Sequence, residues 1–170
     1  MNKGIILLEG CDCAGKSYLA EYLAKKFDGV VRHQTWNKQI QHKIFDIHSA
    51  ALTKAVKISK TRLAIIDRLW MSESVYAVAY RNGTQWPHQG RVMDRVLMTH
   101  GALNIMCLLS PESAERRHSE MKVKREELYT EGNGRVARIY NDIWSGKAYR
   151  IFPDYASHLT RDVCKRNDFI

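Results

Sequence analysis

Residues 10–17 read G-C-D-C-A-G-K-S, which is a complete G-x-x-x-x-G-K-[ST] phosphate-binding loop. The run Ile5-Ile6-Leu7-Leu8 before the loop is short and apolar, and residues 17–27 after it repeat apolar side chains at helical spacing. A strand, a loop and a helix in this order place successive backbone N–H groups and a helix N-terminus around phosphate oxygens. The sequence therefore predicts that this chain binds a nucleoside triphosphate.

The loop itself supplies the expected contacts to ATP and to a metal ion. The backbone would surround the β- and γ-phosphates, the Lys16 ammonium would lie beside them, and the Ser17 hydroxyl would bind Mg²⁺. Two of the loop residues are cysteines without a second cysteine pair, so we interpret them as small loop side chains and not as metal ligands. The predicted ATP-binding set is Gly10, Cys11, Cys13, Ala14, Gly15, Lys16 and Ser17.

The length of the chain predicts one domain over residues 1–170. No apolar stretch reaches membrane-spanning length, and the first strand begins almost at the N-terminus, so we expect no signal peptide and a cytoplasmic protein. Four cysteines in a chain of this size do not form a disulfide framework.

The charge balance is strongly basic, with 27 Lys and Arg against 18 Asp and Glu, a formal net charge of +9. Such a charge suits a polyanionic partner, and nucleotides are polyanions too. The basic residues are spread along the chain without an interleaved array of aromatic residues for base stacking. Nucleotide substrates are therefore the favoured partners, and nucleic acid is not.

Strand and helix patterns alternate along the whole chain. Strands are predicted at 5–8, 30–33, 63–66, 103–109 and 149–152, and helices at 17–27, 38–60, 72–80, 90–99, from 111 with Ser110 as N-cap, and 136–144. This alternation predicts an α/β protein with the three-layer P-loop NTPase fold, a parallel sheet of about five strands with helices on both faces. Ligands of such sheets bind beyond the carboxyl ends of the strands, where the loop, Arg32 and Asp67-Arg68 should meet.

Two segments carry a resemblance to a known family. E-G-C-D-C-A-G-K-S at 9–17 and D-R-L-W-M-S at 67–72 resemble the E-G-x-D-x-A-G-K-[ST] and D-R-Y-x-x-S motifs of the thymidylate kinase group of P-loop nucleotide kinases. Such kinases move the γ-phosphoryl group of ATP onto the 5′-phosphate of a deoxynucleoside monophosphate. The resemblance implies a nucleoside monophosphate kinase that uses ATP and Mg²⁺. The chain is compact, like the trimmed phage-encoded members, for which the host cytoplasm is the expected location. The family is often dimeric, so a homodimer is the matching expectation.

The resemblance also implies roles for individual residues. Asp12 would face the sugar hydroxyl of the acceptor, Asp67 would organise Mg²⁺ with Ser17, and Arg68 would bind the acceptor phosphate. Arg32 lies where the family often has an arginine near that phosphate. Trp36 and Tyr76 are the candidates for contact with the acceptor base. Phosphoryl transfer needs charge neutralisation more than covalent help, which is why cations should converge at the site.

A further source of cations is the basic run R-R-H-S-E-M-K-V-K-R at 116–125. It follows the predicted fourth strand, where the family has an arginine-rich lid, and glycines at 132 and 134 permit a hinge. We therefore predict a lid over 116–132, with Arg116 and Arg125 as candidate catalytic side chains beside Lys16, Arg68 and Asp12. The alternative is a charged helix face in solvent.

The sequence departs from the family where the acceptor base is read. The usual T-R-E-P segment is replaced by V-R-H-Q at 31–34, and Leu69 and Trp70 replace the expected tyrosine pattern, so the base is not predicted. A deoxynucleoside kinase is the nearest alternative, but its general base is an acid just beyond the second strand, and residues 30–37 contain no Asp or Glu. A polynucleotide 5′-kinase would use the positive charge, and a nucleotide-binding protein without turnover is the remaining alternative.

Overall fold

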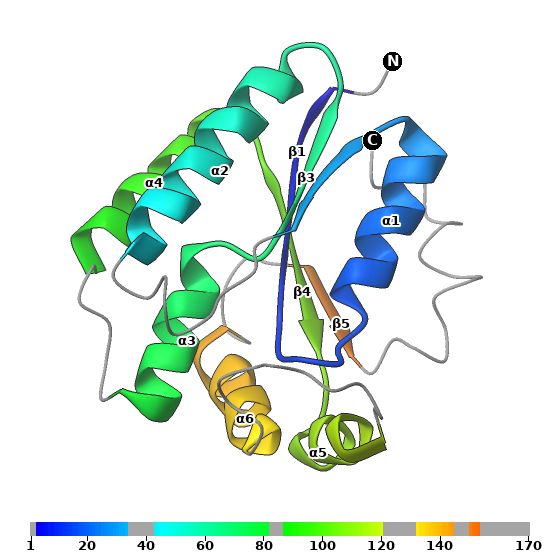
Figure 1. Ribbon diagram of the computed structural model, residues 1–170, viewed down its shortest axis with the longest axis vertical. Coiled ribbons are helices and arrows are strands. Elements are labelled where there is room, and N and C mark those ends of the chain that lie inside the picture. The colour runs from blue at the N-terminus through cyan, green and yellow to red at the C-terminus, as the bar shows by residue number, and fades with distance from the viewer. Residues whose placement is uncertain (1–2, 34–42, 82–86, 121–131, 145–149, 154–170) are drawn as a thin grey trace.

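The computed structural model describes residues 3–33, 43–81, 87–120, 132–144 and 150–153. Strands and helices alternate through these residues (Figure 1). The strands are β1 (Gly4–Glu9), β2 (Val30–His33), β3 (Leu63–Asp67), β4 (Leu103–Leu108) and β5 (Arg150–Pro153). The helices are α1 (Lys16–Phe27), α2 (Ile44–Ser59), α3 (Trp70–Tyr80), α4 (Pro87–Thr99), α5 (Pro111–Glu120) and α6 (Asn133–Trp144).

The five strands form one parallel sheet in the order β2-β3-β1-β4-β5. Helix α1 lies on one side of this sheet, and α2 and α4 lie on the other (Figure 1). The predicted three-layer α/β fold with about five strands and helices on both faces is therefore confirmed. In the sheet register Asp67 is the partner of Leu8 on one side and of His33 on the other, so three carboxyl ends meet at one edge.

The core explains why the central strands are so apolar. All five residues of β3 are buried, and so are five of the six residues of β1, because a parallel sheet is covered on both faces. Charged side chains are an exception in this core. Three of them, Glu9, Lys16 and Asp67, are nonetheless buried together at or just beyond the carboxyl ends of β1 and β3.

Helix boundaries differ from the sequence prediction mainly at the amino ends. Helix α3 begins at Trp70 and α6 at Asn133, earlier than their first clearly apolar repeat, because a helix start is set by capping and tertiary contacts as well as by apolar spacing. The predicted cap of α5 is confirmed, since the Ser113 amide donates to Ser110 Oγ at 3.1 Å. Residues 38–42 of the predicted helix at 38–60 lie outside the described residues.

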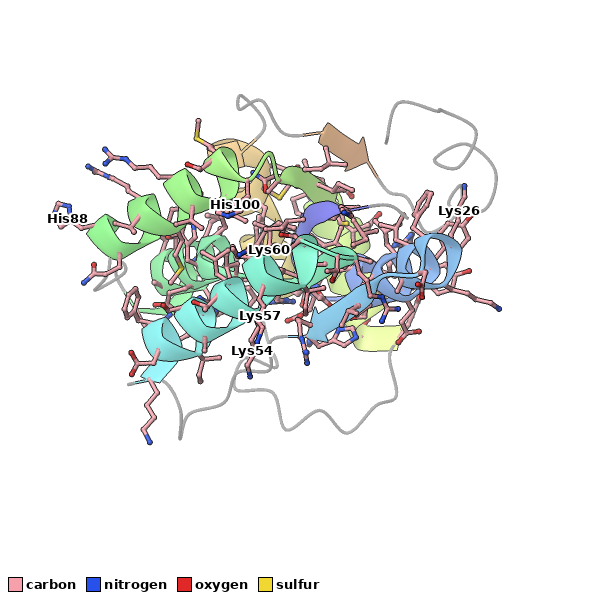
Figure 2. All side chains as sticks on the ribbon, turned by 90° about the horizontal axis from the view of Figure 1, so that it is seen from above. Lys26, Lys54, Lys57, Lys60, His88 and His100 are labelled. Atoms are coloured by element: carbon pink, nitrogen blue, oxygen red, sulfur yellow. The ribbon has the colours of Figure 1, made fainter. Side chains whose placement is uncertain are left out.

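The cysteines and the surface charges agree with the bulk analysis where they are described. Cys11, Cys13 and Cys107 are free thiols. No helix in the described part of the chain has both the length and the apolar character needed to cross a membrane. Exposed basic side chains project from the outer surfaces of three helices, among them Lys26 of α1, Lys54 and Lys57 of α2 and His88 of α4 (Figure 2).

Gly10 tests how tightly β1 packs against β4. Its φ is +144°, and a Cβ atom at this position would lie 2.1 Å from the carbonyl oxygen of Cys107. Gly10→Ala should therefore lower the free energy of unfolding by about 3 kcal/mol or more, measured by urea denaturation. Gly101→Ala is the control, because φ is +59° but nothing lies within 4 Å, and we expect a cost of about 1 kcal/mol. Equal costs at both positions would contradict the steric explanation.

Candidate functional site

The phosphate loop holds its lysine in place without a ligand. Gly15 precedes α1 with a left-handed φ of 80°, and Lys16 is the first helical residue. The Lys16 ammonium donates to the carbonyl oxygen of Cys11 at 2.6 Å and is buried. Burial lowers the pKa of Lys16, and the nearby Arg68 cation adds to the effect, whereas Asp12 and Asp67 oppose it. The Lys16 ammonium is thus fixed within the loop, as an anion-binding loop requires.

A second cluster joins the loop to β3 through a shared carboxylate. Ser17 Oγ donates to Asp67 Oδ2 at 2.7 Å, and Nδ1 of His33 lies 2.9 Å from the same oxygen. The other oxygen, Asp67 Oδ1, is buried and makes no hydrogen bond in the described structure. A carboxylate oxygen left without a donor beside a hydroxyl is a suitable donor set for Mg²⁺, which prefers oxygen ligands.

Among the described residues no group of three or more His, Cys, Asp or Glu side chains is arranged to hold a metal ion. Mg²⁺ is usually bound through one or two carboxylates together with phosphate oxygens and water, which is a smaller set of protein ligands than a transition metal commonly takes.

Arg68 forms the third cluster, with Asp12 and Tyr76. Its guanidinium donates to Asp12 Oδ1, and the Tyr76 hydroxyl donates to Asp12 Oδ2 at 2.9 Å. The guanidinium carbon also lies 5.2 Å from the centre of the Tyr76 ring. Burial disfavours the charge on Arg68, but Asp12 and Tyr76 outweigh this effect and raise its pKa well above the ordinary value. Arg68 is therefore a permanent cation that is already paired in the protein alone.

The backbone at Arg68 explains why neighbouring side chains reach different clusters. Its φ is +73°, in the left-handed region that costs a non-glycine residue about 1–2 kcal/mol. Asp67 contacts Ser17 and His33, whereas Arg68 contacts Asp12 and Tyr76. The strained residue therefore lies between the cluster of Asp67 with Ser17 and His33 and the cluster of Arg68 with Asp12 and Tyr76.

Glu9 forms a buried carboxyl cluster beneath these groups. Its Oε1 accepts from the amide of Leu69 at 2.8 Å and of Ser72 at 3.4 Å, and its Oε2 accepts from Ser72 Oγ at 2.5 Å and from the Tyr140 hydroxyl at 3.3 Å. Burial raises the pKa of Glu9 to about 7, although the hydrogen bonds from Ser72 and Leu69 lower it in part. The cluster joins the ends of β1 and β3 to helices α3 and α6.

Asn133 connects the phosphate loop to the last two helices. Its Nδ2 donates to the carbonyl oxygen of Asp12 at 3.2 Å and to that of Ala114 in α5 at 2.9 Å. The side chain is buried and begins α6 directly after Gly132, whose φ is +83°. One amide thus ties the loop backbone to α5 and α6.

The other predicted site residues have different outcomes. Arg32 is an exposed residue of β2. Arg116 is an exposed residue of α5, 3.9 Å from Glu120, so the described start of the predicted lid is the second half of a helix. Trp36 and Arg125 lie outside the described residues. Tyr76 is brought to the site through its hydroxyl, with Arg68 over its ring.

The sequence analysis assigned no site role to Glu9, Asn133 or His33. Glu9 had a signal, because a carboxylate that ends an apolar strand must find partners when buried. His33 also had one, since the strand end next to Asp67 was predicted. Asn133 had none, because its two acceptors are main-chain carbonyls far away in the sequence.

Comparisons with known proteins find this architecture in solved structures of low sequence identity. No protein-family model matches the chain, and no curated protein matches it. Among solved structures, the YorR protein of Bacillus subtilis in complex with phosphorylated GDP is similar with a TM-score of 0.63 and 21% identity, over 88% of this chain and 84% of that chain.

Two other similar structures are kinases by name. The thymidylate kinase of Candida albicans has a TM-score of 0.59 and 16% identity, over 89% of this chain and 84% of that chain. The deoxyadenosine kinase of M. mycoides, with the products dCMP and dCDP bound, has a TM-score of 0.55 and 17% identity, over 88% of both chains. At these identities the similarity establishes the P-loop kinase fold.

The pKa of Glu9 predicts a pH dependence of stability. Between its ordinary value of 4.5 and its folded value of about 7 the folded protein retains a proton that the unfolded chain has released. The contribution of this group to the free energy of unfolding is therefore complete below pH 4.5 and is lost as the pH rises to about 7. The loss is about 3 kcal/mol at most.

Glu9→Gln removes this titration, and urea denaturation across the same pH range measures it. The free energy of unfolding of the wild type minus that of the variant should decline from pH 4.5 to about 7 and then stay level. A difference that is constant with pH would contradict a protonated Glu9.

Proposed function

We propose that this chain transfers the γ-phosphoryl group of ATP to the 5′-phosphate of a deoxynucleoside monophosphate, as thymidylate kinases do. The observation that carries the proposal is the meeting of two buried or part-buried cations, Lys16 and Arg68, with the buried acid Asp67 at one edge of the sheet. Transfer between two phosphates brings like charges together, so a site for it needs cations on both the donor and the acceptor side.

The donor side is the phosphate loop. The ammonium of Lys16 now contacts only a loop carbonyl within the described structure, and it would exchange this contact for the β- and γ-phosphate oxygens of ATP. Ser17 Oγ and Asp67 would hold Mg²⁺, which neutralises charge on those oxygens when it is bound. His33 supports the cluster by its contact with Asp67 Oδ2, which leaves Oδ1 to face the metal.

The acceptor side is Arg68 and its partners. A 5′-phosphate dianion would take the guanidinium from Asp12 in a charge-assisted, two-pronged pair. Asp12 would then have an oxygen for the sugar hydroxyl of the same nucleotide, while Tyr76 keeps its bond to the other oxygen. Arg32, Trp36 and the lid arginines Arg116 and Arg125 stay predictions for acceptor and lid contacts.

The similar structures support a nucleotide substrate of this kind. One of them is a thymidylate kinase by name, and another holds dCMP and dCDP as products. The identity of the base, the range of monophosphates accepted and a homodimeric state are not part of the proposal.

A nucleoside kinase is the second candidate, and one contact favours it. Such an enzyme needs a general base to take a proton from a neutral hydroxyl. No Asp or Glu stands in β2 or at its end, but His33 does, and its Nδ1 is oriented by Asp67 as a catalytic base would be. The acceptor is an anionic phosphate for the first candidate and a neutral hydroxyl for the second, so an acceptor comparison distinguishes them.

A polynucleotide kinase is less well supported. Lys60 and His100 precede strands β3 and β4, so they lie at the end of the sheet opposite the phosphate loop, and other basic side chains are spread over α1, α2 and α4 (Figure 2). Over the described residues this distribution offers no single track that leads a nucleic acid into the site. A binding protein without turnover would not explain why Lys16, Asp67 and Arg68 converge at one edge of the sheet.

The acceptor test compares each 2′-deoxynucleoside 5′-monophosphate with its matching nucleoside. Arg68 can form a charge-assisted pair with the 5′-phosphate but not with a neutral hydroxyl, so we expect at least about a hundredfold higher kcat/KM for the monophosphate. Release of ADP with ATP and Mg²⁺ measures the rates with dTMP, dGMP, dAMP, dCMP and dUMP and with the five nucleosides. Equal turnover of one nucleoside and its monophosphate would favour the nucleoside kinase instead.

Arg68→Ala tests the division between donor and acceptor. Loss of a charge-assisted pair should raise KM for the monophosphate roughly tenfold or more and leave the Kd of ATP within about twofold. Arg62→Ala is the control, because Arg62 forms an exposed ion pair with Asp28 and should change neither constant. Weaker ATP binding with an unchanged acceptor KM would move Arg68 to the donor side.

A further inference from the structure

The turn between β3 and α3 is held in a conformation that its own sequence does not favour. Arg68 has a φ of +73° without being a glycine, and the residues on either side carry no glycine either. A left-handed residue of this kind persists only where the surrounding structure fixes it. The question is which contacts fix this turn.

Main-chain pairing with β1 supplies only the first of them. The amide of Arg68 donates to the carbonyl oxygen of Leu8 at 2.9 Å. One residue later β1 has ended, because Gly10 turns away with a φ of +144° and packs against the carbonyl of Cys107. The next amide of the turn, that of Leu69, donates to a side chain and not to the backbone of β1.

The side chain that accepts from this amide is that of Glu9. Its Oε1 accepts from the Leu69 amide at 2.8 Å. The N–H groups of Arg68 and of Leu69 are therefore both bonded to the end of β1, the first through a backbone carbonyl and the second through the Glu9 carboxyl. The same carboxyl reaches the first turn of α3 through the amide and hydroxyl of Ser72, at 3.4 and 2.5 Å. The carboxyl thus holds the turn at Leu69 and at Ser72.

We infer that Glu9 is a positioning residue of the transfer site, which directs Asp67 toward Ser17 and Arg68 toward Asp12 by fixing the turn between them. The inference rests on the proposed function for the roles of Asp67 and Arg68. Glu9 touches neither substrate in this account. It acts through the contact of its Oε1 with the Leu69 amide. The length of the Glu9 side chain therefore matters more than its charge.

Two variants separate reach from charge. Glu9→Gln keeps the length and an amide oxygen for the Leu69 N–H, and its NH₂ group can donate to Ser72 Oγ. Glu9→Asp keeps the carboxylate but withdraws it by one methylene. Tyr140→Phe is the matched control, since it removes the 3.3 Å bond to Oε2 and the 2.8 Å bond with Ser72 Oγ but leaves the contact of Oε1 with Leu69 intact.

Hydrogen exchange without any nucleotide gives the first measurement. We expect the amides of Leu69 and Ser72 to exchange at least tenfold faster in Glu9→Asp, and those of 63–66 in β3 to stay unchanged. Glu9→Gln and Tyr140→Phe should stay within about threefold of the wild type at 67–73. Unchanged exchange in Glu9→Asp, or equal acceleration in Tyr140→Phe, would overturn the inference.

Metal binding gives the second measurement, with Mn²⁺ and ATP as probes and no acceptor present. Misplacement of Asp67 should weaken Mn²⁺ binding in the ATP complex at least tenfold in Glu9→Asp, with metal-free ATP binding unchanged and with Glu9→Gln like the wild type. Faster exchange with unaltered Mn²⁺ affinity would make Glu9 a stabilising residue only and overturn the inference. A wild-type protein that turns over no monophosphate contradicts the proposed function alone, because neither measurement uses an acceptor.

Discussion

The register between β1 and β3 is the constraint on which the site depends. Leu8 stands opposite Asp67, so the two strands end within one residue of each other. Beyond this point β1 is followed by the phosphate loop and β3 by α3. The charged clusters lie between these two connections. A shift of one residue would reverse the direction of every side chain in β3 and remove Asp67 from Ser17.

The buried charges at this edge are each compensated in a different way. Lys16 is held by a carbonyl oxygen, Arg68 by a carboxylate and an aromatic ring, and Asp67 by a hydroxyl and an imidazole. Glu9 is compensated by donors and by partial protonation, as its pKa of about 7 indicates. Because an uncompensated buried charge costs several kcal/mol or more, the resting site is stable only with these contacts made. A phosphate ligand therefore exchanges partners with residues that are already paired.

The sequence was sufficient for the fold because the relevant signals are local. The phosphate-loop motif, the apolar strands at 5–8 and 63–66 and the alternation with helices predicted the parallel sheet correctly, and the rule for strand ends predicted where Asp67 and the loop would meet. The pairing of Asp12 with Arg68 was not predicted, nor was the contact of Glu9 with Leu69. Each of these joins residues more than fifty positions apart, and their geometry depends on the left-handed φ of Arg68, for which the sequence carries no glycine signal. The roles given to Arg32, Trp36, Arg116 and Arg125 stay predictions.

The pairing of Arg68 with Asp12 also bears on which anions the site can admit. Asp12 is tethered to the same fold, so it competes for the guanidinium at an effective concentration in the millimolar range or above, roughly as for other short tethers. A free inorganic anion that offers one contact must exceed that concentration to displace it. A ligand that carries its phosphate on a larger body, and gains contacts elsewhere at the same time, faces no such limit. The ion pair thus excludes small free anions from the Arg68 guanidinium by competition, without the help of a lid or loop.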